Sequence, residues 1–438
     1  MKNGKWETSL KERISYGLSD GADNLIFQVM TTYLLYFYTD VFGLNPGSVA
    51  VLFVVARFFD FIESPIVGLM IDHNHSHFGK SRSFFLWFAI PYVIFAILTF
   101  ITPNLSNIGK LIWAYITYLG LGFFYTTVNL PITSILPSLT KNGRETTLLG
   151  VIRQFFGSSV QIIVGTFTIP LVAFFGQGNE KLGFLGTIIL FSLISLFLIL
   201  NTFFWVRERH TNIQKSFQPI KKVWQMLKKN KPWIILSIII FLYWLVTAIK
   251  NQTIIYYFKY IIQQKSLVSL ANGFTFTSLI GVILIMYLTY FKSKKKVMGT
   301  GIIIEFIGQI VIGFGAYSHF LAILFFGIVI NSVGNGIVIG LVSIMIADTI
   351  NYGTNMGIQA EGLLASSDDF GVNLGLGVGG LITSGLFDLS GYKPNQVQNS
   401  ATLNMINVNF VWIPIVIYIV MFICLLFYQE KKMPKISN

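Results

Sequence analysis

The sequence predicts an all-α membrane protein, in which twelve transmembrane helices form two six-helix bundles with both termini in the cytoplasm. Of the 438 residues, 54% are hydrophobic and only 11% are charged, whereas soluble domains carry about 25% charged residues. Apolar stretches of roughly 20 residues, each long enough to cross about 30 Å of hydrocarbon, recur along the chain. The placement of lysine and arginine between these stretches then indicates how many spans there are and how they are oriented.

Short polar loops separate the expected spans, with one long exception. The segment 207–231 is the longest and most basic loop, and it divides the spans six and six. This division predicts an N-terminal bundle over 1–206, a cytoplasmic basic linker over 207–231 and a C-terminal bundle over 232–438. By apolar length, the spans are expected at 18–42, 47–72, 83–102, 109–137, 146–174, 182–206, 233–262, 268–291, 298–317, 320–346, 359–388 and 408–428.

The basic residues are distributed unevenly between the two sets of loops. Loops on the same side as the N-terminus hold 23 of the 31 lysines and arginines, the opposite loops hold five, and Arg57, Arg153 and Lys250 lie inside spans. Basic residues accumulate in cytoplasmic loops. The count therefore predicts a multi-pass protein of the plasma membrane, in bacteria the inner membrane, and it explains the net charge of +13 without nucleic-acid binding.

Several classes of function lack their sequence signals. The single Cys424 excludes an intrachain disulfide framework, and no G-x-x-x-x-G-K-[ST] phosphate loop is present. The three histidines of "HNHSH" (73–77) are interpreted as a solvated turn rather than a metal site. The aromatic residues near span ends are expected to be mostly interfacial anchors; they are Tyr33, Tyr36, Tyr38, Trp113, Trp205 and Trp233. The sequence predicts a protein that is not an enzyme and needs no cofactor.

Ionisable residues inside apolar spans are the strongest functional signal, because a charge at mid-bilayer depth costs at least about 2.5–3.5 kcal/mol. In "RFFDFIESP" (57–65), Arg57, Asp60 and Ser64 share a helix face, with Glu63 at its margin. Asp60 and Ser64 can present oxygens to a small cation. Arg57 can pair with Asp60 or with an acid on another helix. The alternative interpretation is a salt bridge that only fixes helix packing.

Polar groups in other spans suggest a sugar ligand, because hydroxyls both donate and accept hydrogen bonds. Asp20 and Asn24 share a face of the first span, although Asp20 could also be a helix cap. Glu305 is expected either to line a cavity or to pair with a neighbour. The remaining groups are Asp23 beside Asp20 and Asn24, Tyr125, Thr126 and Asn129 of "YTTVNLP", Arg153, Lys250 and Asn251 of "AIKNQT", and Asp368, Asp369 and Asn373 of "SSDDFGVN".

Several stretches taken together match a known family. They are "ISYGLSDGADN" (14–24), "YLLYFYTDVFGL" (33–44), "ARFFDFIESPIVGLMID" (56–72), "FGKSRSF" (78–84), "YTTVNLPITSILPSLT" (125–140), "IRQFFGS" (152–158), "KNQTIIYYFKYII" (250–262), "IMIADTINYG" (344–353) and "GYKPN" (391–395). On these residues the chain resembles the glycoside–pentoside–hexuronide:cation symporter family, the melibiose permease type of the major facilitator superfamily. The resemblance implies two six-helix bundles, alternating access and sugar uptake coupled to a cation.

The resemblance also implies roles for individual residues. Arg57, Asp60 and Pro65 match the family pattern, but Ser64 stands where the family has a second aspartate, with Glu63 one place earlier. Asn24 and Asn129 stand where the melibiose permease has sugar-binding acids. The implied sites are sugar-binding Asp20, Asn24, Asn129, Arg153 and Asn373; cation-coupling Asp60, Glu63, Ser64 and Thr126; and ion-pair or gating Arg57, Lys250, Asp368 and Asp369.

The expected function is uptake of a glycoside or small oligosaccharide by symport with H⁺ or Na⁺. Proton coupling needs only one suitable carboxylate, whereas a Na⁺ site of the melibiose type uses two. The expected partners are the sugar, the coupling cation and the lipid bilayer, with the chain acting as a monomer. The alternatives are an uncoupled sugar facilitator, a non-transporting sensor or lipid-handling protein on the same fold, and a membrane enzyme.

Overall fold

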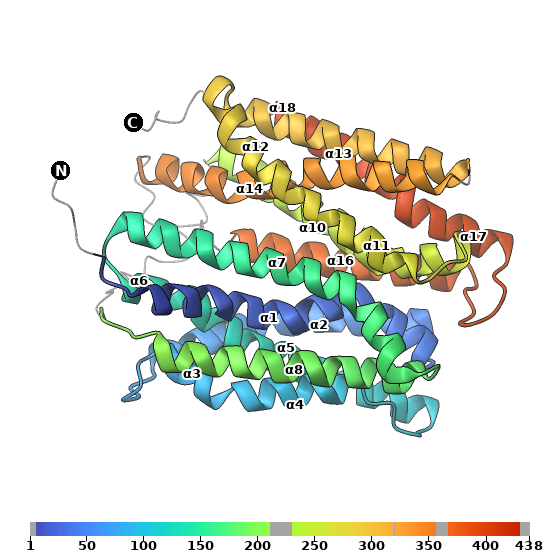
Figure 1. Cartoon of the computed structure of the whole chain (residues 1–438), viewed down its shortest axis with the longest axis horizontal. Coiled ribbons are helices and arrows are strands. Elements are labelled where there is room, and N and C mark those ends of the chain that lie inside the picture. Colours follow the sequence, from blue (N-terminus) through green and yellow to red (C-terminus); the bar gives the residue numbers. More distant parts are fainter. Residues whose placement is uncertain (1–5, 211–229, 319, 356–366, 430–438) are drawn as a thin grey trace. The chain divides into compact units, whose positions relative to one another are not determined.

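The computed structural model describes residues 6–210, 230–318, 320–355 and 367–429, and every long element among them is a helix (Figure 1). The chain separates into two compact units, Met1–Gln214 and Lys215–Asn438, called unit 1 and unit 2 below. The domain boundaries expected at 206 and 232 stay a prediction, because residues 211–229 lie outside the described part.

Unit 1 is a bundle in which α1 lies against both α7 and α8 (Figure 1). Its fifth and sixth spans are single long helices, while its third is broken at Phe88 into two shorter helices. The elements are α1 (Leu10–Tyr36), a π-helical turn η1 (Phe37–Val41), α2 (Pro46–Asp72), α3 (Arg82–Trp87), α4 (Ala89–Thr99), α5 (Asn107–Ser134), α6 (Leu136–Leu139), α7 (Gly143–Gly176) and α8 (Glu180–Trp205).

Unit 2 is a second helical bundle, in which α13 packs along α14 and α10 packs along α16. Its elements are α10 (Lys231–Tyr256), η2 (Tyr257–Ile261), α11 (Leu267–Phe274), η3 (Thr275–Thr277), α12 (Ser278–Phe291), α13 (Lys294–Tyr317), α14 (Leu321–Asn355), α16 (Ser367–Leu389), α17 (Ser400–Asn407), η4 (Val408–Trp412) and α18 (Ile413–Leu426).

In the described part of the chain, nine helical segments are long and apolar enough to cross a membrane. The other three expected spans correspond to α1 and α2, which carry ionisable side chains, and to the broken pair α3 and α4. Several ends differ from the expected ones: α1 begins at Leu10 rather than residue 18, because Ser9 and Glu12 form a capping box there. Similarly, α13 begins at Lys294 rather than at 298.

The helices α13 and α14 approach so closely that their backbones touch. A Cβ atom built on Gly308 would lie 2.4 Å from the backbone nitrogen of Asn331, and one on Gly334 would lie 2.6 Å from that of Glu305. Glycine allows this approach because it has no side chain. The contact leaves the Glu305 side chain with 0% exposure.

The expectation that three tyrosines are interfacial anchors is wrong. Tyr33, Tyr36 and Tyr38 are each 0% exposed. The Tyr33 hydroxyl donates to the backbone oxygen of Gly165 at 2.8 Å, and the Tyr36 hydroxyl to a carboxylate oxygen of Glu180 at 2.9 Å. These hydrogen bonds join α1 to α7 and α8, so a position near the end of a span did not imply exposure.

Candidate functional site

Four polar side chains form a cluster between α1 and α7, called the α1–α7 cluster. Arg153 Nε lies 2.9 Å from Asp20 Oδ1 in an ion pair. The Asn24 amide donates to the backbone oxygen of Asp20 at 2.7 Å and to its Oδ2 at 3.3 Å. Gln161 completes the cluster by donating to Asn24 Oδ1 at 2.7 Å. Three of the residues predicted to bind sugar are thus brought together in unit 1.

The backbone of α7 makes room for this cluster at Gly157. A Cβ atom on Gly157 would lie 2.1 Å from Asp20 Oδ2 and 3.2 Å from the Asn24 amide nitrogen. Since bonded geometry fixes the direction of Cβ, no residue larger than glycine fits without displacing Asp20. The carboxylate therefore packs directly on the α7 backbone, one turn beyond Arg153.

Two sequence-based expectations change at this cluster. The interpretation of Asp20 as a helix cap is wrong, because Ser9 caps α1 and Asp20 lies well inside the helix. Gln161 was not among the predicted site residues. The spacing of Gln161 was a partial signal, since eight residues are a little over two helical turns and place it at the edge of the face that carries Arg153.

Asn129 belongs to a second cluster, between α1, α4 and α5. Its amide nitrogen donates to Asp23 Oδ2 at 2.6 Å, and the Tyr92 hydroxyl lies 3.3 Å from Asp23 Oδ1. Asp23 is 1% exposed. The polar group that Asn129 contacts in the structure is thus Asp23, which the sequence prediction had not included among the site residues.

A third cluster, the α2–α5 cluster, contains the predicted cation-coupling acids. Arg57 Nη1 lies 2.8 Å from Asp60 Oδ2, and Arg57 Nη2 donates to the Tyr118 hydroxyl of α5 at 3.3 Å. The structure thus shows the first of the two pairings expected for Arg57. The Asp60 side chain remains 19% exposed, so the pair is not sealed from its surroundings.

The carboxylates of Asp60 and Glu63 face the same glycine of α5. A Cβ atom on Gly122 would lie 3.7 Å from Asp60 Oδ1 and 3.8 Å from Glu63 Oε2. The hydroxyl of Thr126, one turn along α5, donates to the Gly122 backbone oxygen at 3.1 Å. Ser64 is half-buried on α2. The displaced acid Glu63 therefore still faces the same place as Asp60, because its longer side chain compensates for its position at the margin of the helix face.

Unit 2 holds the remaining predicted residues. Lys250 Nζ donates to Asn331 Oδ1 at 2.5 Å, which links α10 to α14. Asn373 is half-buried on α16. The side chains of Asp368 and Asp369 lie outside the described part of the structure, so their predicted ion-pair or gating role stays a prediction.

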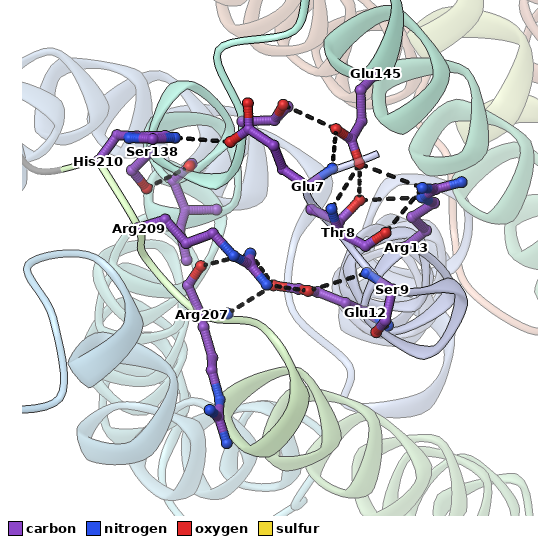
Figure 2. Close-up of polar contacts among 12 residues, drawn as sticks. Glu7, Thr8, Ser9, Glu12, Arg13, Ser138, Glu145, Arg207, Arg209 and His210 are labelled. Carbon is purple, nitrogen blue, oxygen red and sulfur yellow. Dashed lines mark hydrogen bonds and ion pairs between the residues drawn. The ribbon is translucent and has the colours of Figure 1, made fainter. Parts of the chain in front are cut away.

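A polar cluster at the N-terminal end of α1 surrounds Glu145 (Figure 2). The backbone nitrogens of Thr8 and Glu7 donate to its carboxylate at 2.8 and 2.9 Å, and the hydroxyls of Thr8 and Thr140 also donate to it. Burial raises the pKa of Glu145, but these hydrogen bonds outweigh burial and lower the pKa to about 2. The carboxylate therefore stays ionised and holds the chain before α1 against α7.

The segment that follows α8 returns to the same end of unit 1 (Figure 2). Arg209 binds both carboxylate oxygens of Glu12 at 2.6 and 2.7 Å, and the backbone nitrogens of Arg209 and His210 donate to the Ser138 backbone oxygen. His210 Nε2 lies 2.7 Å from Glu7 Oε2, and this hydrogen bond lowers the pKa of Glu7. The start of the predicted linker is thus fixed to α1 and α6.

Comparison with known proteins now identifies the family. The sequence profile described as "MFS/sugar transport protein" matches residues 15–431. The chain belongs to this family. Over 425 residues it is 39% identical to the isoprimeverose transporter of Lactiplantibacillus pentosus, covering 96% of this chain and 89% of that one. Over 417 residues it is 29% identical to the inner membrane symporter YicJ of Escherichia coli (strain K12), covering 94% and 90%.

A solved structure supports the fold in the same way. The crystal structure of a D-xylose-proton symporter matches with a TM-score of 0.69 at 13% identity, over 96% of this chain and 97% of that one. This likeness confirms the major facilitator fold predicted from the sequence. Together with the family, it makes the chain a multi-pass membrane transporter of the glycoside/cation symporter type, not an enzyme.

Proposed function

We propose that this transporter takes up isoprimeverose, or a glycoside of similar size, together with protons. The observation that carries the proposal is the pair of carboxylates facing Gly122, of which one is neutralised by Arg57. Asp60 and Arg57 together contribute no net charge, so Glu63 leaves the α2–α5 cluster with one negative charge when it is ionised. One bound monovalent cation balances that charge.

Two features favour a proton over Na⁺ as this cation. Arg57 already forms an ion pair with Asp60, so the Asp60 carboxylate is a weaker ligand for a metal ion. Glu63 is 6% exposed, and its Oε2 has no hydrogen-bond partner among the described residues. A hard cation requires several oxygen ligands at once, whereas a proton requires one carboxylate oxygen. Glu63 supplies that oxygen.

The α1–α7 cluster supports sugar recognition. Asp20 and the amide oxygens accept hydrogen bonds from hydroxyls, while Arg153 and the amide nitrogens donate to them. The side chains of Arg153 and Asp20 are 27% and 12% exposed, so both keep surface through which a ligand could bind. We assign Asp20, Asn24, Arg153 and Gln161 to one side of the glycoside site, and Asn129 to the neighbouring α1–α5 contact.

Transport into proteoliposomes tests the coupling ion directly. Labelled isoprimeverose is supplied under an imposed proton gradient without Na⁺, or under a Na⁺ gradient with equal pH on both sides. We expect accumulation under the proton gradient alone and its loss in Asp60→Asn. Accumulation under the Na⁺ gradient alone would contradict proton coupling, and equilibration without accumulation under either gradient would indicate an uncoupled facilitator. Unlabelled glucose and xylose, added as competitors, report whether the site requires a larger glycoside.

The cytoplasmic position of both termini and the monomeric state belong to the same proposal. The bias of 23 basic residues on the N-terminal side supports the orientation. Labelling of single cysteines, introduced at Ser9 and at Ser106 after Cys424→Ser, tests the orientation in intact cells. A membrane-impermeant reagent should label the second site and spare the first. Labelling of the first site alone would show that the termini lie on the outer side of the membrane, which contradicts the proposed orientation.

A further inference from the structure

Unit 2 contains a buried acid and a partly buried base that the proposed coupling by Glu63 does not use. Glu305 lies on α13 with 0% exposure, at the place where α13 and α14 touch. Lys250 lies on α10 and is only partly buried. Residues of α14 connect the two, so the network runs from a partly exposed lysine to a fully buried carboxyl group.

Asn331 is the centre of this network. It accepts a hydrogen bond from Lys250 Nζ at 2.5 Å through Oδ1, and its amide nitrogen donates to the Glu305 backbone oxygen at 2.7 Å. One turn further along α14, Asn335 donates to Glu305 Oε1 at 3.3 Å. The other oxygen, Glu305 Oε2, has no hydrogen-bond partner among the described residues.

The ionisable groups around Glu305 come from two other helices. Lys250 and Tyr243 face it from α10, and Tyr418 faces it from α18. Both tyrosines are nearly fully buried, at 4% and 2% exposure. Asn335 contacts the Tyr243 hydroxyl at 3.0 Å, and Asn331 lies 3.4 Å from the Tyr418 hydroxyl. Among the described residues, Lys250 therefore supplies the positive charge that compensates an ionised Glu305.

Each protonation state of Glu305 has one unfavourable feature. When Glu305 is ionised, Lys250 compensates its charge, but Oε2 is a buried anionic oxygen with no donor, which is costly. When Glu305 is protonated, that cost falls, but the Lys250 ammonium group loses its counter-charge. The ionised state leaves a buried oxygen without a donor, and the protonated state leaves the lysine without a counter-charge. A modest change in the surroundings of Lys250 is therefore enough to change which protonation state of Glu305 is preferred.

We propose that Glu305 is a second proton-binding group of the transport cycle, and that Lys250 is the counter-charge that allows its proton to leave. On binding, a hydronium ion transfers its proton to Oε2, an O–H bond forms and water is left. On release, water accepts the proton and the carboxylate is again compensated by Lys250. This inference rests on the proposed proton symport and adds a coupling group in unit 2.

Infrared difference spectroscopy of the purified, reconstituted chain tests the protonation of Glu305 without relying on transport. The carbonyl stretch of protonated carboxyl groups is followed between pH 5 and pH 9 in the unmodified chain and in Glu305→Gln. We expect a component that titrates in the unmodified chain and is absent from the variant. Superimposable titrations of the two proteins would overturn the proposal.

Two further variants keep the test informative if Glu305→Gln folds poorly. Lys250→Met removes the counter-charge, so the carboxyl component should persist to higher pH than in the unmodified chain. Asp348→Asn is the matched control, because it breaks the 2.7 Å ion pair between Lys294 of α13 and Asp348 of α14, and it should leave the component unchanged. A Lys250→Met titration identical to that of the unmodified chain would also overturn the proposal.

Proton counting separates this inference from the proposed function. In Glu305→Gln we expect the number of protons taken up per glycoside to fall by one, while the proton gradient still drives accumulation. An unchanged ratio in this variant would overturn the role of Glu305 alone. Absence of proton-driven accumulation in the unmodified chain would instead overturn the proposed symport itself.

Discussion

Replacing Gly157 with alanine tests the α1–α7 cluster without changing any charge. The added Cβ atom would lie 2.1 Å from Asp20 Oδ2, and such contacts are not tolerated below 3.0 Å, so the carboxylate must move by about 0.9 Å. A displacement of about 1 Å in a positioning group can reduce activity by about 100-fold. We expect Gly157→Ala to weaken glycoside affinity by about 10- to 100-fold, which corresponds to about 1.4–2.8 kcal/mol.

Gly150→Ala on the same helix is the matched control. A Cβ atom there meets no atom within 4 Å, and alanine stabilises an exposed helix by about 0.5–1 kcal/mol relative to glycine. Binding is measured by the concentration of unlabelled glycoside that halves exchange of the labelled sugar across proteoliposomes. Thermal unfolding of both variants checks that they fold. If Gly157→Ala is folded and binds like Gly150→Ala, the assignment of Asp20 to the sugar site is wrong.

Two further predictions concern the N-terminal end of unit 1. Glu145 has a folded-state pKa of about 2, below the ordinary value of 4.5, so its contribution to stability is complete above about pH 4.5 and is lost as the pH falls toward 2. Thermal unfolding between pH 6 and pH 3 should show this loss of stability in the unmodified chain but not in Glu145→Gln. At pH 6 the variant should be less stable by about 2 kcal/mol. Parallel stability profiles of the two proteins would contradict the stabilising role of the ionised Glu145. Arg209→Lys cannot keep both contacts to Glu12, so limited proteolysis beyond residue 210 should become several-fold faster. Arg207 contacts Glu12 through its backbone nitrogen, so Arg207→Lys should not change the rate. Equal rates for the two variants would contradict the inference that the Arg209 side chain holds this segment on Glu12.

Local spacing was sufficient to predict part of the site. The i, i+3 spacing of Arg57 and Asp60 on one helix face offered this pairing as one of two, and the structure places their charged atoms 2.8 Å apart. The spans followed from apolar length, because a helix in lipid must satisfy its own backbone hydrogen bonds. The breaks and ends depended on particular side chains, such as the Ser9 cap that starts α1 eight residues early.

Contacts between helices could not be predicted from spacing alone. The pairing of Asp20 with Arg153 joins residues 133 positions apart, and it depends on the close approach that Gly157 allows. The same holds for Asn129 with Asp23 and for the network from Lys250 to Glu305. In each case a polar residue in an apolar span indicated that a partner was needed, but only the packing of the helices determined which residue that partner is.

The central claim is that Glu63 binds the coupling proton, and proton-driven accumulation by Glu63→Gln tests this claim most directly. The substitution keeps the size of the side chain but removes the carboxylate that faces Gly122 beside Asp60. We predict that this variant still exchanges labelled for unlabelled glycoside across proteoliposomes, and no longer concentrates it under an imposed proton gradient. Accumulation by Glu63→Gln to the level of the unmodified chain would contradict the account.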